Sequence, residues 1–213
     1  MNKKDLSETD IITKFVLPAI RRSGSGWTDD LFLQEYVLTP DRITTKGRAG
    51  RTRIPNTSKR ADIVLFYKPN QPLAVIEAKD NTHPLGGGMQ QARAYANLLG
   101  APFAYSTNGD AFLECDQSDP NKTVEREIAL HAFPSRDELW QRWSRARGLT
   151  AAQEALVTQD WYLGTADKPP RYYQIKAVNR VVDAIAKGQS RILLVMATGT
   201  GKTYTAFQII WRL

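Results

Sequence analysis

The order of hydrophobic and polar positions predicts that the chain opens with an amphipathic helix. Over residues 6–22, apolar side chains recur at the three- and four-residue spacing of one helix face. Ser7 and Asp10 fit a capping box at the start of this helix. Pro18 is expected to kink or shorten it, because proline removes a helical hydrogen bond. A strand is then expected around residues 34–38.

The middle of the chain has the pattern of a sheet that alternates with helices. Two apolar runs, 62–67 and 72–79, are rich in β-branched and aromatic residues and flank a turn-forming stretch at 68–71, which predicts a β-hairpin. The elements expected next are a loop that ends at the glycines 86–88, a helix that stops at Gly100, strands over 102–108 and 110–116 around the turn at Asn108-Gly109, a loop over 119–123, and helices near 135–147 and 150–158. This order indicates a mixed α/β fold.

The composition changes near residue 148, and a second domain is expected after a linker. Residues 159–170 lack periodicity and end in two prolines, which is typical of a domain boundary. A helix over about 171–187, a buried strand over 191–197, a glycine-rich turn and a further helix follow. A strand–loop–helix unit cannot bury both faces of a sheet, so we expect the opening of a larger α/β domain and a chain that is a fragment. The expected parts are a first domain (1–147), a connection (148–168) and the start of the second domain (169–213).

Length and composition narrow the class of protein. The 213 residues are 42% hydrophobic and 24% charged, as in ordinary globular proteins. No apolar run reaches the ~20 residues that a membrane-spanning helix needs, so no membrane association is expected. The single cysteine, Cys115, excludes a disulfide framework and cysteine-rich zinc sites, and two histidines, His83 and His131, leave little for a histidine-based metal site. A reducing, cytoplasmic setting is expected.

Positive charge is concentrated in one stretch of the sequence. The net charge is +7, and residues 41–60 hold seven basic side chains and one acid, so this stretch accounts for six of the seven net charges. The basic residues are Arg42, Lys46, Arg48, Arg51, Arg53, Lys59 and Arg60. Such a stretch favours contact with a polyanion, most simply nucleic acid. A solvated hairpin without a partner is the alternative.

Three charged residues are expected to converge at one end of the predicted hairpin. Glu77 and Lys79 project from the same face of their strand, because side chains two residues apart do so. Asp62 opens the partner strand and lies at the same end of the ladder. Carboxylate oxygens bind Mg²⁺, and a metal-bound water beside a lysine suits attack on a phosphate. The alternative is a solvent-exposed Glu–Lys pair without a function.

The spacing of these residues resembles a nuclease motif. D-x14-E-x-K on a hairpin is similar to the PD-(D/E)xK nuclease superfamily, with Ala61 in place of the nominal proline. Gln91 and Tyr95 form Q-x-x-x-Y on one face of the next helix, which resembles the extra motif of the RecB-like branch and of type I restriction enzymes. Gln90 is a register alternative, but it has no tyrosine four residues on. The resemblance implies that Gln91 and Tyr95 position DNA and the active site; a core aromatic is the alternative for Tyr95.

The resemblance also implies the roles within this site. Asp62, Glu77 and Lys79 are the implied catalytic residues, and Asp62, Glu77 and the main-chain carbonyl of Ala78 are the implied Mg²⁺ ligands. Lys79 is implied to act on the attacking water or the phosphate. Glu8, on the first helix, is a candidate for the further acid that many members carry, the alternative being a first-turn acid favoured by the helix dipole. His83 is expected to be a loop residue.

A glycine-rich loop near the end of the chain is predicted to bind ATP. MATGTGKT (196–203) follows the expected strand and opens a helix, the context in which backbone N–H groups cradle phosphates. Met196 replaces the first glycine of the general pattern, but the form resembles superfamily 2 helicases. The expected ATP-binding residues are Gly199, Thr200, Gly201, Lys202 on the β- and γ-phosphates, and Thr203 on Mg²⁺. A glycine-rich turn without a ligand is the alternative.

The segment before this loop resembles the Q motif of the same helicases. In RYYQIKA (171–177), Gln174 is expected to pair with adenine through its amide, and Arg171 or Tyr172 to pack on the base. An ordinary helix start with aromatic core residues is the alternative. The sequence has no DExx segment and no arginine finger, so the chain is not expected to hydrolyse ATP efficiently.

The two motif sets together resemble the motor and restriction (R) subunit of type I restriction enzymes, over essentially the whole chain. The resemblance implies a mixed-sheet nuclease core with flanking helices, followed by the opening of a RecA-like domain, and a prokaryotic setting. It implies Mg²⁺ and ATP as cofactors, and double-stranded DNA, specificity and methyltransferase subunits as partners. It also implies cutting away from the recognition site after ATP-driven translocation. The alternatives are a stand-alone RecB-like helicase–nuclease for repair or phage defence, and a non-catalytic DNA-binding module.

Overall fold

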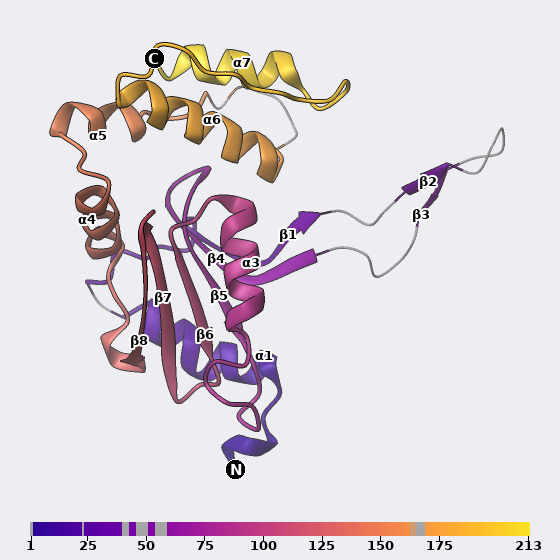
Figure 1. Ribbon diagram of the computed structural model, residues 1–213. Coiled ribbons are helices and arrows are strands. Elements are labelled where there is room, and N and C mark those ends of the chain that lie inside the picture. Colours follow the sequence, from indigo (N-terminus) through magenta and orange to yellow (C-terminus); the bar gives the residue numbers. More distant parts are fainter. Residues whose placement is uncertain are drawn as a thin grey trace.

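The computed structural model describes residues 2–22, 24–39, 43–45, 51–53, 59–162, 164 and 169–213, and a mixed sheet lies at its centre (Figure 1). Among these residues, six strands form this sheet in the order β1-β4-β5-β6-β7-β8. The strands are β1 (Phe32–Thr39), β4 (Lys59–Lys68), β5 (Gln71–Ala78), β6 (Phe103–Thr107), β7 (Ala111–Asp119) and β8 (Lys122–Ala129). Neighbours are antiparallel except β5 and β6, which run parallel. A parallel pair needs a crossover, and helix α3 (Met89–Leu99) supplies it.

The sheet separates two hydrophobic cores. On one face, α3 packs Ala92 and Ala96 into a cluster that includes Val75 of β5. On the other face, the N-terminal helical segment contributes Ile11 to a larger cluster that includes Ile76. Because β4 and β5 are covered on both faces, their central residues are almost all buried. The expected mixed α/β core with flanking helices is therefore confirmed.

The first helix starts at the predicted cap, and its geometry changes locally before Pro18. The Asp10 backbone N–H donates to Ser7 Oγ at 3.2 Å, and the Ser7 N–H donates to Asp10 Oδ2 at 3.3 Å, which completes the capping box. The segment comprises a 3-10 turn η1 (Lys3–Asp5), α1 (Glu8–Ile11), a π-helical turn η2 (Ile12–Val16) and α2 (Leu17–Ile20). The π turn ends at Val16, two residues before Pro18, which lacks an N–H and would clash with a regular preceding turn. The expected disruption is thus a local widening, and the helix continues to Ile20.

The turns predicted around the central strands are confirmed. Asn70 closes the β4–β5 hairpin with a φ of +63°, a left-handed conformation that asparagine tolerates. Gly100 ends α3 with a φ of +78°, and Gly109 turns β6 into β7 with a φ of +86°. Both glycines adopt conformations that a side chain would strain.

Strand β8 is not predicted by the sequence pattern. The loop expected over 119–123 shrinks to a turn at 120–121, and the chain pairs again from Lys122. Within β8 only Ile128 is buried, because this strand forms the sheet edge in the described chain. Charged residues dominate its exposed positions, which hides the alternation that marks a strand and protects an edge from further pairing.

The helices after the sheet form where the pattern places them. They are α4 (Arg136–Ala146), α5 (Ala151–Val157), α6 (Tyr172–Ala186) and α7 (Lys202–Trp211). The short 3-10 turn η3 (Leu130–Ala132) before α4 was not predicted. The helices α5, α6 and α7 lie together at one end of the sheet (Figure 1). The described part of 159–170 has no helix or strand, as expected for a linker. Asn179 of α6 donates from Nδ2 to the Asn70 carbonyl at 2.9 Å, which ties α6 to the β4–β5 turn.

The prediction of a buried strand over 191–197 is wrong. This segment has no regular secondary structure, and Leu193 and Val195 are 88% and 83% exposed. A strand needs a hydrogen-bonded neighbour, and no described strand pairs with this segment. The RecA-like opening and the domain boundaries at 147 and 168 therefore stay predictions.

The basic segment 41–60 lies largely outside the described residues. Within it, β2 (Ile43–Thr45) and β3 (Arg51–Arg53) pair antiparallel, and Lys59 and Arg60 begin β4 with exposed side chains. Across the described ranges, every helix is too short or too polar to span a membrane.

Candidate active site

Two carboxylates meet where β4 and β5 pair. Ile63 lies opposite Ile76, so Asp62 lies beside Glu77. Asp62 Oδ2 accepts a hydrogen bond from the Ala78 backbone N–H at 2.8 Å, and Glu77 Oε1 accepts one from the Asp62 N–H at 3.2 Å. Each acid is thus fixed by the partner strand. The structure brings together the acids that the hairpin pattern paired.

Glu77 is an unusual core residue. Its side chain is fully buried, and its Oε2 atom has no hydrogen-bond partner. Burial and then the charge of Asp62 raise the pKa of Glu77 to about 8. Burial also raises the pKa of Asp62, against the hydrogen bond from Ala78. A buried carboxylate oxygen without a partner is costly, and either a proton or a cation removes that cost.

The donor set fits a hard divalent cation. Within the described residues, no three His, Cys, Asp or Glu side chains are grouped to hold a metal ion. A cation at Asp62 and Glu77 would therefore take two carboxylates and complete its shell with main-chain oxygen and water. Mg²⁺ is commonly held in this way, since it keeps several of its waters. The carbonyl of Ala78 follows Glu77 directly along β5.

Lys79 lies just past β5 and pairs with the first helix. Its backbone N–H donates to the Thr107 carbonyl at 2.8 Å, and its Nζ donates to Glu8 Oε1 at 3.0 Å. Burial opposes the charge of Lys79, but the hydrogen bond and charge of Glu8 outweigh it and raise the pKa of Lys79. The lysine is therefore a cation, which suits stabilising phosphate charge or orienting water better than removing a proton. Glu8 lies at the site, but its carboxylate forms an ion pair with Lys79.

Gln91 and Tyr95 share the face of α3 beside these acids. Gln91 Nε2 donates to the Tyr95 hydroxyl at 3.4 Å. Burial and then the charge of Glu77 raise the pKa of Tyr95, so its phenol lies within the field of Glu77. Gln90, the register alternative, is also exposed, but Gln91 is the glutamine that contacts Tyr95.

The sequence pattern gave no role to Gly88 and Ser106, which lie beside Glu77. The Gly88 N–H donates to Ser106 Oγ at 3.0 Å, and Ser106 Oγ donates to the Leu85 carbonyl at 2.7 Å. A Cβ at Gly88 would lie 3.0 Å from Glu77 Cβ and 3.2 Å from its carbonyl oxygen. The start of α3 can pack on Glu77 only because residue 88 is glycine. The sequence signal that could have indicated this close packing is the run of three glycines at 86–88.

The loop after Lys79 is held by local hydrogen bonds. His83 Nδ1 lies 3.0 Å from Asp80 Oδ1, which also accepts from the Thr82 N–H at 2.9 Å. Hydrogen bonds from Thr82 and His83 lower the pKa of Asp80 to about 2. His83 is half-exposed and faces this turn, as expected for a loop histidine.

The glycine-rich loop and the start of α6 contact each other. Gly199 and Gly201 have φ of +78° and +84°, and α7 begins at Lys202. Gln174 Nε2 donates to the Thr200 carbonyl at 3.0 Å, and a Cβ at Gly201 would clash with this amide. The loop therefore follows the glycine-dependent path that the sequence predicts, with Lys202 exposed at the helix start.

Both polar atoms of Gln174 are used inside the protein. Its Oε1 accepts from the Arg171 N–H at 2.9 Å, which caps α6. Arg171 donates from its guanidinium to the Tyr173 hydroxyl at 2.9 Å, and Tyr173 donates in turn to the Thr200 carbonyl at 3.3 Å. Arg171 and Gln174 thus lie at the loop, while Thr203 is exposed on the first turn of α7.

Comparison with known proteins yields consistent matches. The family described as "Type I restriction enzyme R protein N terminus" matches residues 48–132, and "Type III restriction enzyme, res subunit" matches residues 167–213. The chain is 50% identical over 214 residues to the type I restriction enzyme EcoAI endonuclease subunit of Escherichia coli, covering 100% of this chain and 26% of that protein. It is 35% identical over 164 residues to the EcoKI endonuclease subunit of Escherichia coli K12, covering 72% of this chain and 13% of that protein.

One solved structure extends the likeness to the fold. It is a fragment assigned to the HsdR subunit of a type I restriction enzyme from Vibrio vulnificus, with a TM-score of 0.81 and 38% sequence identity. The match covers 98% of this chain and 38% of that one. The chain thus spans about a quarter of the first curated relative, and the site described above falls within the matched regions.

Proposed function

The chain belongs to the family of type I restriction enzyme R (HsdR) subunits, and we propose on that basis that it carries the Mg²⁺-dependent DNA endonuclease site of such a subunit. The observation that carries the proposal is the buried Glu77, whose Oε2 lacks a partner beside Asp62. A structural acid would have its second oxygen satisfied, whereas a cation ligand needs it free.

Each residue of the site has a proposed role in phosphodiester hydrolysis. Asp62, Glu77 and the Ala78 carbonyl hold the cation. When bound, a divalent cation polarises the phosphate and lowers the pKa of its water. Lys79, kept protonated by Glu8, orients that water and offsets the phosphate charge. Gln91 and Tyr95 contact the DNA backbone beside Glu77.

The second proposed role belongs to the glycine-rich loop. Lys202 and Thr203 would bind the phosphates and Mg²⁺ of ATP, with Gly199, Thr200 and Gly201 shaping the loop and Gln174 and Arg171 beside it. We place the nuclease domain at 1–147, the connection at 148–168 and the start of an ATPase domain at 169–213. The chain alone is not expected to hydrolyse ATP efficiently, because the sequence lacks a DExx segment.

The proposed partners are double-stranded DNA and the specificity and methyltransferase subunits of a restriction–modification complex. ATP-driven translocation would deliver DNA to the nuclease, which would cut away from the recognition site. The basic segment 41–60 would supply phosphate contacts, which bind without reading sequence. The family match favours this function over a stand-alone helicase–nuclease. Stable association with a methyltransferase complex separates the two.

Plasmid cleavage tests the proposed nuclease. The chain, and the longer subunit assembled with its partners and ATP, are incubated with supercoiled plasmid and Mn²⁺. We expect metal-dependent nicking in at least the assembled enzyme, because the acids already face each other. Lys79→Ala should lose it, whereas Lys122→Ala, at an exposed lysine of β8, should keep it. Nicking that persists in Lys79→Ala, or no cleavage by the assembled enzyme, contradicts the proposal.

A further inference from the structure

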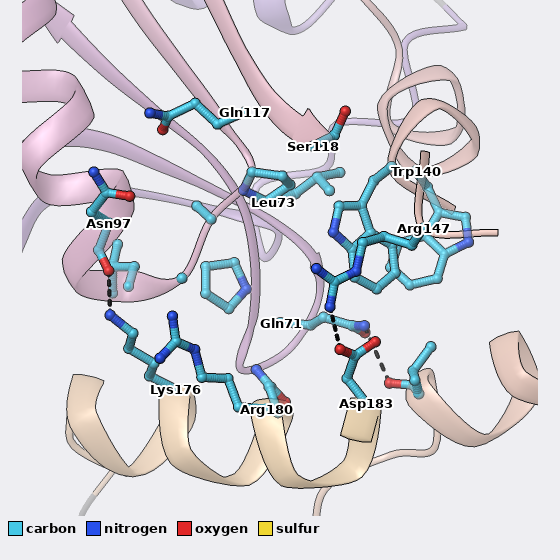
Figure 2. A pocket seen from close by; sticks show the side chains of 18 residues that line it. Gln71, Leu73, Asn97, Gln117, Ser118, Trp140, Arg147, Lys176, Arg180 and Asp183 are labelled. Carbon is cyan, nitrogen blue, oxygen red and sulfur yellow. Dashed lines mark hydrogen bonds and ion pairs between the residues drawn. The ribbon is translucent and has the colours of Figure 1, made fainter. Parts of the chain in front are cut away.

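Helix α6 packs against the end of the sheet at which β4 turns into β5. Figure 2 shows this junction, with Asp183 of α6 bonded to Arg147 and with Gln71 of β5 facing α6. Val178 of α6 and Leu73 of β5 are buried in the same core cluster. The nuclease sheet and the helix that precedes the glycine-rich loop therefore share one hydrophobic core.

A buried arginine holds the end of α7 at this junction. Arg212, the residue after α7, is 1% exposed. Its Nε donates to the Gln159 carbonyl at 3.0 Å, and its Nη2 donates to the Val157 carbonyl at 2.6 Å. Its Nη1 donates to Asn179 Oδ1, also at 2.6 Å. All three acceptors are neutral, and a buried cation is costly unless such acceptors satisfy it, so the arginine depends on staying in this place.

Two of these acceptors lead directly to the β4–β5 turn. Asn179 accepts from Arg212 through Oδ1 and donates from Nδ2 to the Asn70 carbonyl at 2.9 Å. The Val157 carbonyl accepts from Arg212 and also from Gln71 Nε2 at 3.2 Å. Asn70 lies in the turn of the hairpin, and Gln71 begins β5. The end of α7 is thus connected to the hairpin by two bridges, each of which passes through one residue.

The other end of α7 lies at the glycine-rich loop. The helix runs from Lys202 to Trp211, and its 10 residues span roughly 15 Å. Near its end, the buried Gln208 accepts from the Tyr162 N–H at 3.1 Å and donates to the Tyr162 carbonyl at 3.0 Å. A continuous helix joins the loop to Arg212, so the stability of the loop affects how firmly Arg212 is held.

We propose that Arg212 and Asn179 couple the glycine-rich loop to the nuclease hairpin, so that a nucleotide bound at the loop stabilises the hairpin that carries the two acids. This inference rests on the proposed ATP site and extends it. A ligand that binds the folded loop makes opening of α7 less frequent. Opening of α7 withdraws Arg212 from both bridges and loosens the turn, so a ligand that suppresses the first event suppresses the second. The hairpin is then held most firmly while nucleotide is bound.

Hydrogen–deuterium exchange of the complete R subunit, with and without a non-hydrolysable ATP analogue, tests this coupling. We expect the analogue to slow exchange at the loop, residues 199–203. It should also slow exchange at the β4–β5 turn, residues 68–71, by at least about threefold, a factor within the range of one net hydrogen bond. The turn between β7 and β8, residues 120–121, lies at the sheet edge and serves as the internal control that does not respond.

Two substitutions remove the bridges in different ways. Arg212→Met keeps apolar bulk at the buried position and removes the donors, so the turn should no longer respond while the loop is still protected. Asn179→Asp keeps an acceptor for Arg212 and loses the donor to Asn70, so the response of the turn should be reduced. This milder variant also carries the test if Arg212→Met does not fold. Arg145→Met, the same change at an exposed arginine of α4, should respond like the unsubstituted subunit.

The possible failures are distinguishable. A protected loop with an unaffected turn in the unsubstituted subunit would overturn the coupling. A turn response that persists undiminished in the folded variants would overturn it as well. Protection of neither the loop nor the turn would contradict the proposed ATP site, and the inference would fail with it. The nuclease has its own assay in plasmid cleavage, so its failure is seen separately.

Discussion

Replacing Glu77 with alanine is expected to abolish DNA cleavage by the complete type I enzyme and to leave its ATP turnover intact. The substitution removes one of two carboxylates at the proposed cation, so the Lewis acid and its activated water are lost. A loss of about 4 kcal/mol of transition-state stabilisation corresponds to about a thousandfold in rate. The fold should survive, because Oε2 of Glu77 makes no hydrogen bond, Oε1 accepts only the one from the Asp62 N–H, and the carboxylate charge is costly to bury.

Cleavage of plasmid DNA and release of phosphate from ATP, measured on the same preparation, check this separation. Glu127→Ala is the matched control, since it removes an exposed acid from the edge strand β8. It should retain both activities. Circular dichroism shows whether each variant is folded. Parallel loss of cleavage and ATP turnover in a folded Glu77→Ala enzyme would contradict separate sites.

Lys202→Ala is expected to have the opposite primary effect. Lys202 begins α7 directly after the left-handed Gly201, where the loop's N–H groups and the helix N-terminus favour phosphate. Removing its charge should reduce ATP turnover by at least about a hundredfold, because the β- and γ-phosphates lose their cation. Cleavage that depends on translocation should stop as a consequence, although the nuclease acids are untouched.

Phosphate release by the assembled enzyme measures this effect, with Arg191→Ala as the control. Arg191 is exposed in the segment before the loop, so its loss should leave ATP turnover unchanged. Mn²⁺ binding to Lys202→Ala should equal that of the unsubstituted protein. Unchanged ATP turnover in Lys202→Ala would remove this lysine from the nucleotide site.

The parts of the fold that local sequence specifies are those that the pattern predicted. The β4–β5 hairpin combines two apolar runs with a turn at Asn70, and α3 ends at a glycine, so each signal lies within a few neighbouring residues. Strand β8 was not predicted, because its pairing with β7 stabilises a segment whose own residues are mostly exposed. The prediction of a strand over 191–197 was wrong for the opposite reason. Its own residues are apolar, but an apolar run forms a strand only beside a partner strand, and no described strand pairs with it.

The candidate site likewise contains contacts that local sequence predicts and contacts that depend on the tertiary structure. The meeting of Asp62 and Glu77 follows from hairpin register, which a sequence can indicate. The ion pair of Lys79 with Glu8 joins residues 71 positions apart. No local pattern predicts that Glu8 pairs with this lysine instead of binding a metal ion. The contact of Gly88 with Glu77 is likewise tertiary.

Calorimetric titration of Mn²⁺ into the chain tests the central claim, that Asp62 and Glu77 form a cation site. We expect saturable binding that is lost in both Asp62→Asn and Glu77→Gln. Because the pKa of Glu77 is raised to about 8, the acid is protonated near pH 6 and must release its proton to bind metal. Affinity should therefore increase by one to two orders of magnitude, roughly, between about pH 6 and about pH 8. Absence of Mn²⁺ binding, or binding that both variants retain, would contradict the claim.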